Sequence, residues 1–187
     1  MAYKNIIIID KNIDVKPFLD EIDPKHWDWV ATQTQRKIGG DKNPYGFLPL
    51  VWAQVKRGED PHDAMGQAKT PLYDLYPKVH EFWKKYNITE TGRAAFFRLL
   101  PGGNVGEHID RGEYYKKKDR YHLSLQGTYL YKVGDEQMLV PPGTFFWFNN
   151  KLPHAAKNVG PVDRYSLVWD VPHSPNNPQH LSRTSNT

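Results

Sequence analysis

RLLPGGNVGEHID, residues 98–110, combines the end of an apolar strand, a tight turn and the start of a second strand. Similar short runs of apolar and aromatic residues, separated by Gly, Pro and Asp turns, continue to residue 172. Seven or eight short strands at this spacing predict a β-sandwich or a jelly-roll barrel. We therefore expect a mainly β fold whose core spans residues 93–172.

The N-terminal hundred residues are expected to flank this barrel as strands and outer helices. The isoleucine run at 6–9 predicts a buried strand, since β-branched residues suit a sheet. Apolar residues at three- and four-residue spacing predict a helix over 70–86, with Pro77 as an alternative start. The other assignments are a short helix over 18–22, an edge strand at 33–36, a loop over 39–49, a strand over 50–55 and a polar segment over 57–69.

Composition restricts the classes of protein that are plausible. The 187 residues suit one domain, expected over 1–172, with 173–187 as a polar, disordered tail. Zero Cys excludes disulfides, thiolate metal sites and a cysteine nucleophile, and fits a cytoplasmic protein. There is no apolar run of about 18 residues, so no membrane span is expected. The oligomeric state stays open.

The basic residues do not form one broad patch in the sequence. The net charge is only +4, and the densest cluster is Lys116, Lys117 and Lys118. Nucleic acid is therefore not an expected partner, since it calls for a wide basic face. The lysines either lie in a solvated loop or attract a charged substrate.

His108 and Asp110 stand at i and i+2, so on an extended strand their side chains share one face. His154 follows a later turn and begins another strand. Two imidazoles and one carboxylate form the facial triad of non-haem Fe(II) oxygenases, which leaves open coordination positions. The plain alternative is that His154 is a structural histidine and Asp110 a turn cap.

A second polar group follows ten residues after His154. Arg164 and Ser166 share one strand face and offer a charged fork and a hydroxyl, which suit the carboxylate of a bound acid. Another strand places Arg120, His122, Ser124 and Gln126 on one face. A run of polar side chains that faces a barrel interior is costly unless it has a partner.

Four blocks in this order resemble the aspartyl/asparaginyl β-hydroxylase family of Fe(II)/2-oxoglutarate dioxygenases: RLLPGGNVGEHID, RYHLSL, PPGTFFWFNNKLPHAAKN and DRYSLVWDV. The resemblance covers roughly residues 93–172. It implies a double-stranded β-helix, with Fe(II), 2-oxoglutarate and O₂ as cofactor and cosubstrates. It further implies His108 and His154 as iron ligands, Arg164 as the anchor of the distal oxoglutarate carboxylate, and Arg120 and His122 close to the oxoglutarate.

One position departs from the family pattern. The peptide-hydroxylating members that give the family its name lack the carboxylate ligand, whereas this chain has Asp110 there. Relatives that hydroxylate free amino acids such as proline keep that Asp. The expected substrate is therefore a free amino acid or an Asp/Asn-type peptidyl residue. The alternatives are a cupin-type metalloenzyme that uses no oxoglutarate and a non-catalytic jelly-roll binding protein.

The segment from 111 to 119 leaves the metal strand at Asp110 and returns at Arg120. It holds Arg111, Tyr114 and Tyr115, more charge and aromatic surface than a plain connection needs. One hypothesis makes it a loop that closes over the substrate, with these three residues as substrate contacts. The other makes it a solvated loop end.

Overall fold

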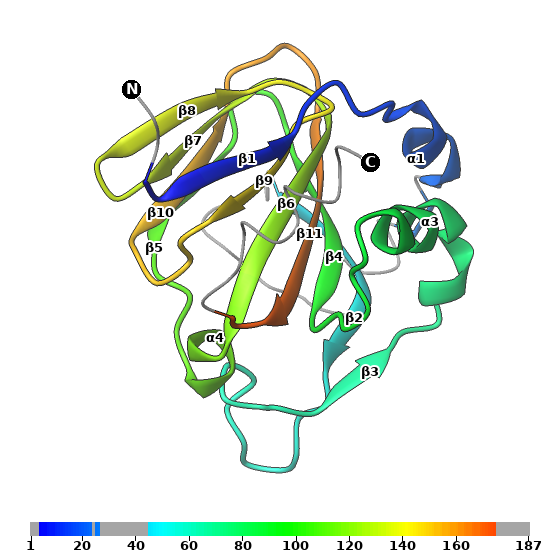
Figure 1. The fold of residues 1–187 in the computed structure, drawn as a ribbon, viewed down its shortest axis with the longest axis vertical. Helices are drawn as coiled ribbons and strands as arrows, with labels where there is room; N and C mark the ends of the chain where they lie inside the picture. Colours follow the sequence, from blue (N-terminus) through cyan, green and yellow to red (C-terminus); the bar gives the residue numbers. More distant parts are fainter. Residues whose placement is uncertain (1–3, 24, 27–44, 175–187) are drawn as a thin grey trace.

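The computed structural model describes residues 4–23, 25–26 and 45–174. Two antiparallel sheets face one another (Figure 1). The larger sheet has the order β1 (Ile6–Asp10), β9 (Phe145–Phe148), β6 (Lys118–Gln126), β11 (Arg164–Pro172), β4 (Ala94–Leu99), β2 (Tyr45–Ala53), β3 (Gln67–Lys69). The smaller has the order β5 (Asn104–His108), β10 (His154–Asn158), β7 (Tyr129–Val133), β8 (Glu136–Val140).

The two faces of the larger sheet have different neighbours, because side chains alternate along each strand. On β11, Leu167 and Trp169 belong to an outer core. Phe146 and Phe148 of β9 point the other way, into a second core shared with β7, β8 and β10 of the smaller sheet. Arg164 and Ser166 lie on this inward face of β11, where the site is built.

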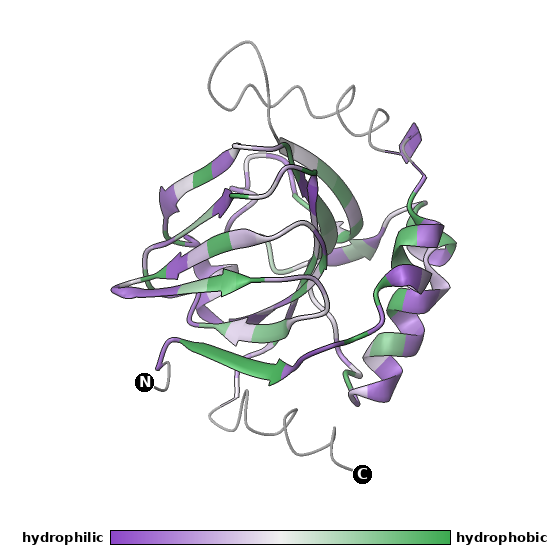
Figure 2. Cartoon of the chain, turned by 90° about the horizontal axis from the view of Figure 1, so that it is seen from above, coloured by the Kyte–Doolittle hydropathy of each residue, from purple (hydrophilic) through white to green (hydrophobic). Residues whose placement is uncertain are grey.

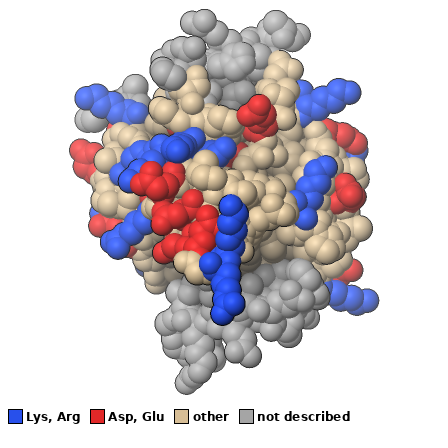
Figure 3. Space-filling model, turned by 90° about the horizontal axis from the view of Figure 1, so that it is seen from below, with Lys and Arg blue, Asp and Glu red and all other residues tan. Residues whose placement is uncertain are grey.

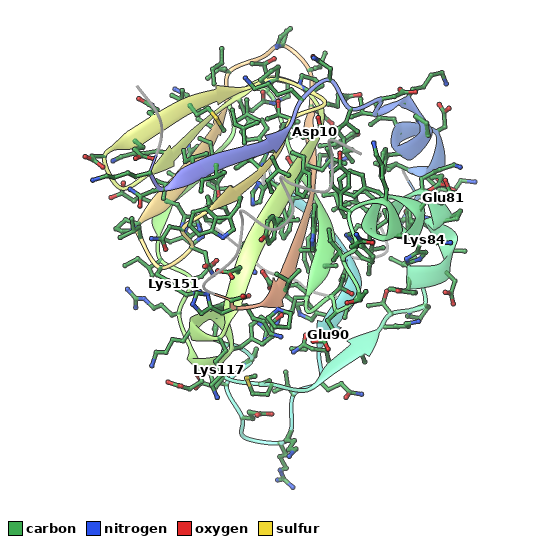
Figure 4. The ribbon with its side chains drawn as sticks, viewed as in Figure 1. Asp10, Glu81, Lys84, Glu90, Lys117 and Lys151 are labelled. Carbon is green, nitrogen blue, oxygen red and sulfur yellow. The ribbon has the colours of Figure 1, made fainter. Side chains whose placement is uncertain are left out.

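Helices cover the outer face of the larger sheet. They are α1 (Lys16–Glu21) and α3 (Pro77–Lys85), which lie together on one side of the sheets (Figure 2). Phe82 of α3 meets Trp169 with ring centroids 5.8 Å apart. Glu81 and Lys84 lie on the opposite, solvent side of the helix (Figure 4). This amphipathic packing supplies most of the stability of such short helices.

The mainly β, two-sheet jelly-roll with helices outside is therefore confirmed. Of the two predicted starts for the helix over 70–86, the later one is confirmed, because α3 begins at Pro77. Residues Tyr73–Leu75 form only a 3₁₀ turn. The predicted loop over 39–49 is wrong from residue 45 onward, because β2 begins there and pairs with β4 despite its glycine and proline. The predicted strand at 33–36 lies outside the described residues.

The chain end is partly described. His173 Nδ1 lies 3.0 Å from Asp119 Oδ1, so the first residues of the predicted tail pack against β6. Residues 175–187 lie outside the described part. Within the described residues, no helix combines the length and the apolar character needed to cross a membrane.

Candidate metal centre

The structure brings His108, Asp110 and His154 together. One ligand atom from each lies within 4.8 Å of the other two. His108 ends β5 and His154 begins β10, and the two are direct cross-strand partners. Asp110 follows two residues after His108, on the same side. Strand pairing therefore places two of the ligands, and the short segment that follows the end of β5 places the third.

Both imidazoles are oriented by backbone carbonyls. His108 Nδ1 lies 2.8 Å from the carbonyl oxygen of Gly106, and His154 Nδ1 lies 3.0 Å from that of Leu152. A carbonyl only accepts, so each Nδ1 carries a proton, and the nitrogen that a metal can bind is Nε2. This is the state in which histidine binds a metal through Nε2.

The protonation state of His154 also fits a ligand. Burial lowers its pKa, with smaller contributions in the same direction from His108 and Arg120, and these outweigh the opposing effect of Asp110. The ring is therefore neutral near neutral pH. Two imidazoles and a carboxylate suit a divalent iron ion and leave further positions for small ligands. The donor set fits the cofactor that the sequence indicated.

A cavity that is partly open to solvent is lined by two of the three candidate ligands, His108 and His154. Its walls come from both sheets and combine aromatic side chains with a few polar ones. They include His108, His154, Arg120, His122, Arg164, Phe97, Tyr131 and Phe148.

The inward face beyond the ligands holds buried polar atoms that lack a hydrogen-bond partner among the described residues. Arg164 is 3% exposed and its Nε is without a partner. Ser166 and Ser124 are cross-strand partners, and neither Oγ has one. The Tyr129 hydroxyl is likewise unpaired, while its ring lies 4.0 Å under the Arg164 guanidinium. Buried polar groups are normally paired, so this set is suited to an anionic ligand.

His122 also lies on this face, as the sequence indicated. Its ring packs against Tyr131 and Phe146, each with centroids 5.1 Å away. Burial lowers the pKa of His122 well below its ordinary value, and the charges of Arg164 and Arg120 act in the same direction. A neutral ring with an unpaired Nδ1 can still bind a ligand by one hydrogen bond.

Arg120 also lines the cavity and contacts two carboxylates. Its Nη1 is 2.9 Å from Asp110 Oδ2, and its Nε donates to Asp170 Oδ1 at 2.7 Å. Burial would lower the pKa of Arg120, but Asp110 and Asp170 raise it well above its ordinary value. The arginine therefore stays charged. In the structure its partners are protein carboxylates, whereas the resemblance placed it beside the oxoglutarate.

The segment 111–119 differs from the predicted open loop. Residues Glu113–Lys116 form a helical turn, α4, and β6 begins at Lys118. Tyr114 and Tyr115 are 0% and 6% exposed. The Tyr114 hydroxyl accepts from the backbone N–H of Arg93 at 2.8 Å. Buried aromatic anchors fix the segment, so both tyrosines support the fold where they lie, and their role as substrate contacts stays a prediction.

Arg111 and Lys151 lie beside this segment. Arg111 is exposed next to Asp110, and its contact with substrate also stays a prediction. Lys151, labelled in Figure 4, follows β9 and donates to the carbonyl oxygens of Tyr115 and Lys118. It thereby ties the β9–β10 loop to the start of the strand that carries Arg120.

Tyr114→Phe is expected to destabilise the protein. The change removes the acceptor of a buried backbone N–H, and leaving such a donor unsatisfied costs about 1–3 kcal/mol. Urea unfolding would measure the loss. The matched control is Tyr73→Phe on the half-exposed 3₁₀ turn, where a change of about 0.5 kcal/mol or less is expected. Equal stabilities of the two variants would show that the Tyr114 hydroxyl does not anchor the segment.

Two site residues were not singled out from the sequence. Asp170 continues the inward series of Arg164 and Ser166 at spacing two along β11, and that periodicity could have indicated it. Tyr129 comes from the smaller sheet, and its place under Arg164 follows from sheet packing, for which no local signal exists.

The surface mixes charges. On the face shown in Figure 3, acidic and basic side chains lie among each other and among neutral ones. Lys116 of the lysine cluster pairs with Glu113 on the same turn, and Lys132 pairs with Glu107 at 2.7 Å. The expectation that nucleic acid is not a partner remains a prediction.

Sequence comparison identifies one family. The family described as aspartyl/asparaginyl beta-hydroxylase matches residues 25–174, which include every candidate site residue. No curated protein matches the chain.

One of two solved structures compared with the chain supports the fold. An oxidoreductase of the 2OG-Fe(II) oxygenase family from Burkholderia pseudomallei aligns with a TM-score of 0.56 at 11% identity, covering 89% of this chain and 83% of that one. The cupin domain of Cnp3 from Schizosaccharomyces pombe aligns with a TM-score of 0.44 at 10% identity, over 76% of this chain and 74% of that one. The first likeness supports the fold, and the second is too distant to support an inference.

Proposed function

Because the chain belongs to the aspartyl/asparaginyl β-hydroxylase family, we propose that it is an Fe(II)- and 2-oxoglutarate-dependent dioxygenase that hydroxylates an unactivated C–H bond. The observation that carries this proposal is the shared cavity. His108, His154 and the buried Arg164 line the same cavity. One carboxylate oxygen of Asp110 lies within 4.8 Å of a ring nitrogen of each histidine. A metal site and an anion site in one cavity suit an iron ion and a keto acid together.

Each group has a separate role in this proposal. His108, Asp110 and His154 hold the iron, which when bound supplies the O₂ activation that couples oxoglutarate decarboxylation to hydroxylation. Arg164 pairs with the distal carboxylate of 2-oxoglutarate, and Ser166 adds a hydrogen bond. The aromatic walls, such as Phe148 and Tyr131, exclude water from the reacting groups.

The substrate proposed is a free amino acid or an Asp/Asn-type peptidyl residue. The complete triad with Asp110 supports a free amino acid as the substrate, and the family assignment supports a peptidyl residue. Arg111 is exposed near the ligands and is available to a substrate carboxylate.

Turnover of 2-oxoglutarate tests the proposal. With Fe(II), ascorbate and O₂, we expect the protein to form succinate, and to form more with the right member of a panel of free amino acids and Asp- or Asn-containing peptides. Mass spectrometry should find that substrate heavier by the mass of one inserted oxygen, about 16 Da. A protein with His154→Ala serves as the control.

The outcome also separates the alternatives. Binding of iron without any oxoglutarate consumption would favour a cupin-type metalloenzyme without that cosubstrate. Absence of metal binding would favour a non-catalytic jelly-roll protein.

A further inference from the structure

We propose that Arg120 and Asp170 are positioning residues, which hold the Asp110 carboxylate with one oxygen toward the metal and the other away from it. The inference rests on the proposed function, because it concerns the geometry of an iron ligand. It also assigns Arg120 a role other than contact with oxoglutarate.

The two oxygens of Asp110 face different groups. Oδ1 lies 3.9 Å from His154 Nε2, on the side of the other candidate ligands. Oδ2 lies 2.9 Å from Arg120 Nη1. The Asp110 side chain is only 8% exposed, so water offers little competing contact. This contact is an ion pair and not a hydrogen bond, since Oδ2 has no hydrogen-bond partner among the described residues. The ion pair holds Oδ2 toward the guanidinium and leaves Oδ1 facing the other candidate ligands.

Arg120 is itself fixed by Asp170. Its Nε donates to Asp170 Oδ1 at 2.7 Å and its Nη2 to Oδ2 at 3.0 Å, a two-point pairing. Asp170 is completely buried, and it stands directly opposite Arg120 in the ladder between β11 and β6. The Tyr115 ring lies 4.7 Å from the guanidinium carbon. The planar fork therefore has one orientation, which directs its remaining nitrogen at Asp110.

A carboxylate needs this kind of support because the torsion that rotates it is broad and roughly two-fold. Without a partner for Oδ2, Asp110 could turn away or bind the metal through both oxygens. Binding through both would occupy a position that the cosubstrate needs. Groups that orient metal ligands are typically worth about 10- to 100-fold in metal affinity.

Charge alone would act differently. An arginine beside the site repels a metal cation, so a purely electrostatic Arg120 would weaken binding, and Asp170 would offset that repulsion. Arg120→Lys keeps the charge but lacks the planar fork. An orienting role predicts that this variant loses affinity, whereas a charge role predicts no change.

The test measures Co(II) binding to the full chain as a probe for Fe(II), by calorimetry and by the visible absorption of the bound ion. We expect Asp170→Asn and Arg120→Lys each to lower the affinity about 10- to 100-fold and to alter the absorption bands. The control is Asp119→Asn, the neighbouring buried carboxylate on β6, which pairs with His173. It should leave affinity and spectrum unchanged.

A double-mutant cycle with Asp110→Ala locates the effect. If Arg120 acts through Asp110, Arg120→Lys should have no further effect on Co(II) affinity once Asp110 is absent. Should Asp170→Asn fail to fold, Arg120→Lys and this cycle decide the question. Wild-type affinity and spectrum in Arg120→Lys, or an equal loss in the Asp110→Ala background, would overturn the positioning role. A wild-type protein that binds no Co(II) or Fe(II) would instead refute the proposed function.

Discussion

His108→Ala and His154→Ala are each expected to abolish iron binding and oxoglutarate turnover. Each change leaves two ligands, which cannot fix the coordination geometry. The loss of affinity should exceed the roughly 10- to 100-fold typical of residues that only support a ligand. Calorimetric titration with Fe(II) under anaerobic conditions measures the affinity, and succinate formation measures the turnover.

The matched control for this prediction is His80→Ala. His80 lies on α3, where its Nε2 is 3.0 Å from the Tyr73 carbonyl oxygen, outside the metal-site cavity. This variant should bind iron like the wild type. Retention of normal iron binding and turnover by both ligand variants would show that the triad is wrong, whatever the family of the chain.

Arg164→Lys is expected to raise the concentration of 2-oxoglutarate that the enzyme requires. Lysine keeps the positive charge but loses the two-point fork, and a hydrogen bond to a charged group is worth about 1.5–3 kcal/mol. The KM for oxoglutarate should therefore rise roughly ten- to hundredfold, while Fe(II) affinity stays close to that of the wild type. Steady-state kinetics and a metal titration separate the two quantities.

Arg98→Lys provides the control for the cosubstrate prediction. Arg98 lies on β4, one residue after the cavity residue Phe97, so its side chain belongs to the other side of the strand. The KM of the Arg98→Lys variant for oxoglutarate should equal that of the wild type. If Arg164→Lys also keeps the wild-type KM, the distal carboxylate is anchored by another residue of the inward face.

Local patterns were sufficient for much of the fold. Seven or eight short strands separated by turns predicted a mainly β sandwich or jelly-roll barrel, and the structure has two antiparallel sheets. The isoleucine run became β1, and Pro77 marked the start of α3. The segment from 45 to 49 was misassigned, since pairing of β2 with β4 overrides the weak strand propensity of Gly and Pro.

The candidate site divides in the same way. The sequence by itself determined that Arg164 and Ser166 share a face, because spacing two fixes side-chain direction on a strand such as β11. It also predicted that His108 and Asp110 lie together, although Asp110 lies beyond the end of β5. Only the tertiary structure decided that His154 pairs with His108, that Arg120 contacts Asp110 and Asp170, and that Tyr114 is buried. Those contacts depend on the order of strands in the sheets and on the packing of α4. Both arise from interactions between segments far apart in the chain, which local periodicity does not encode.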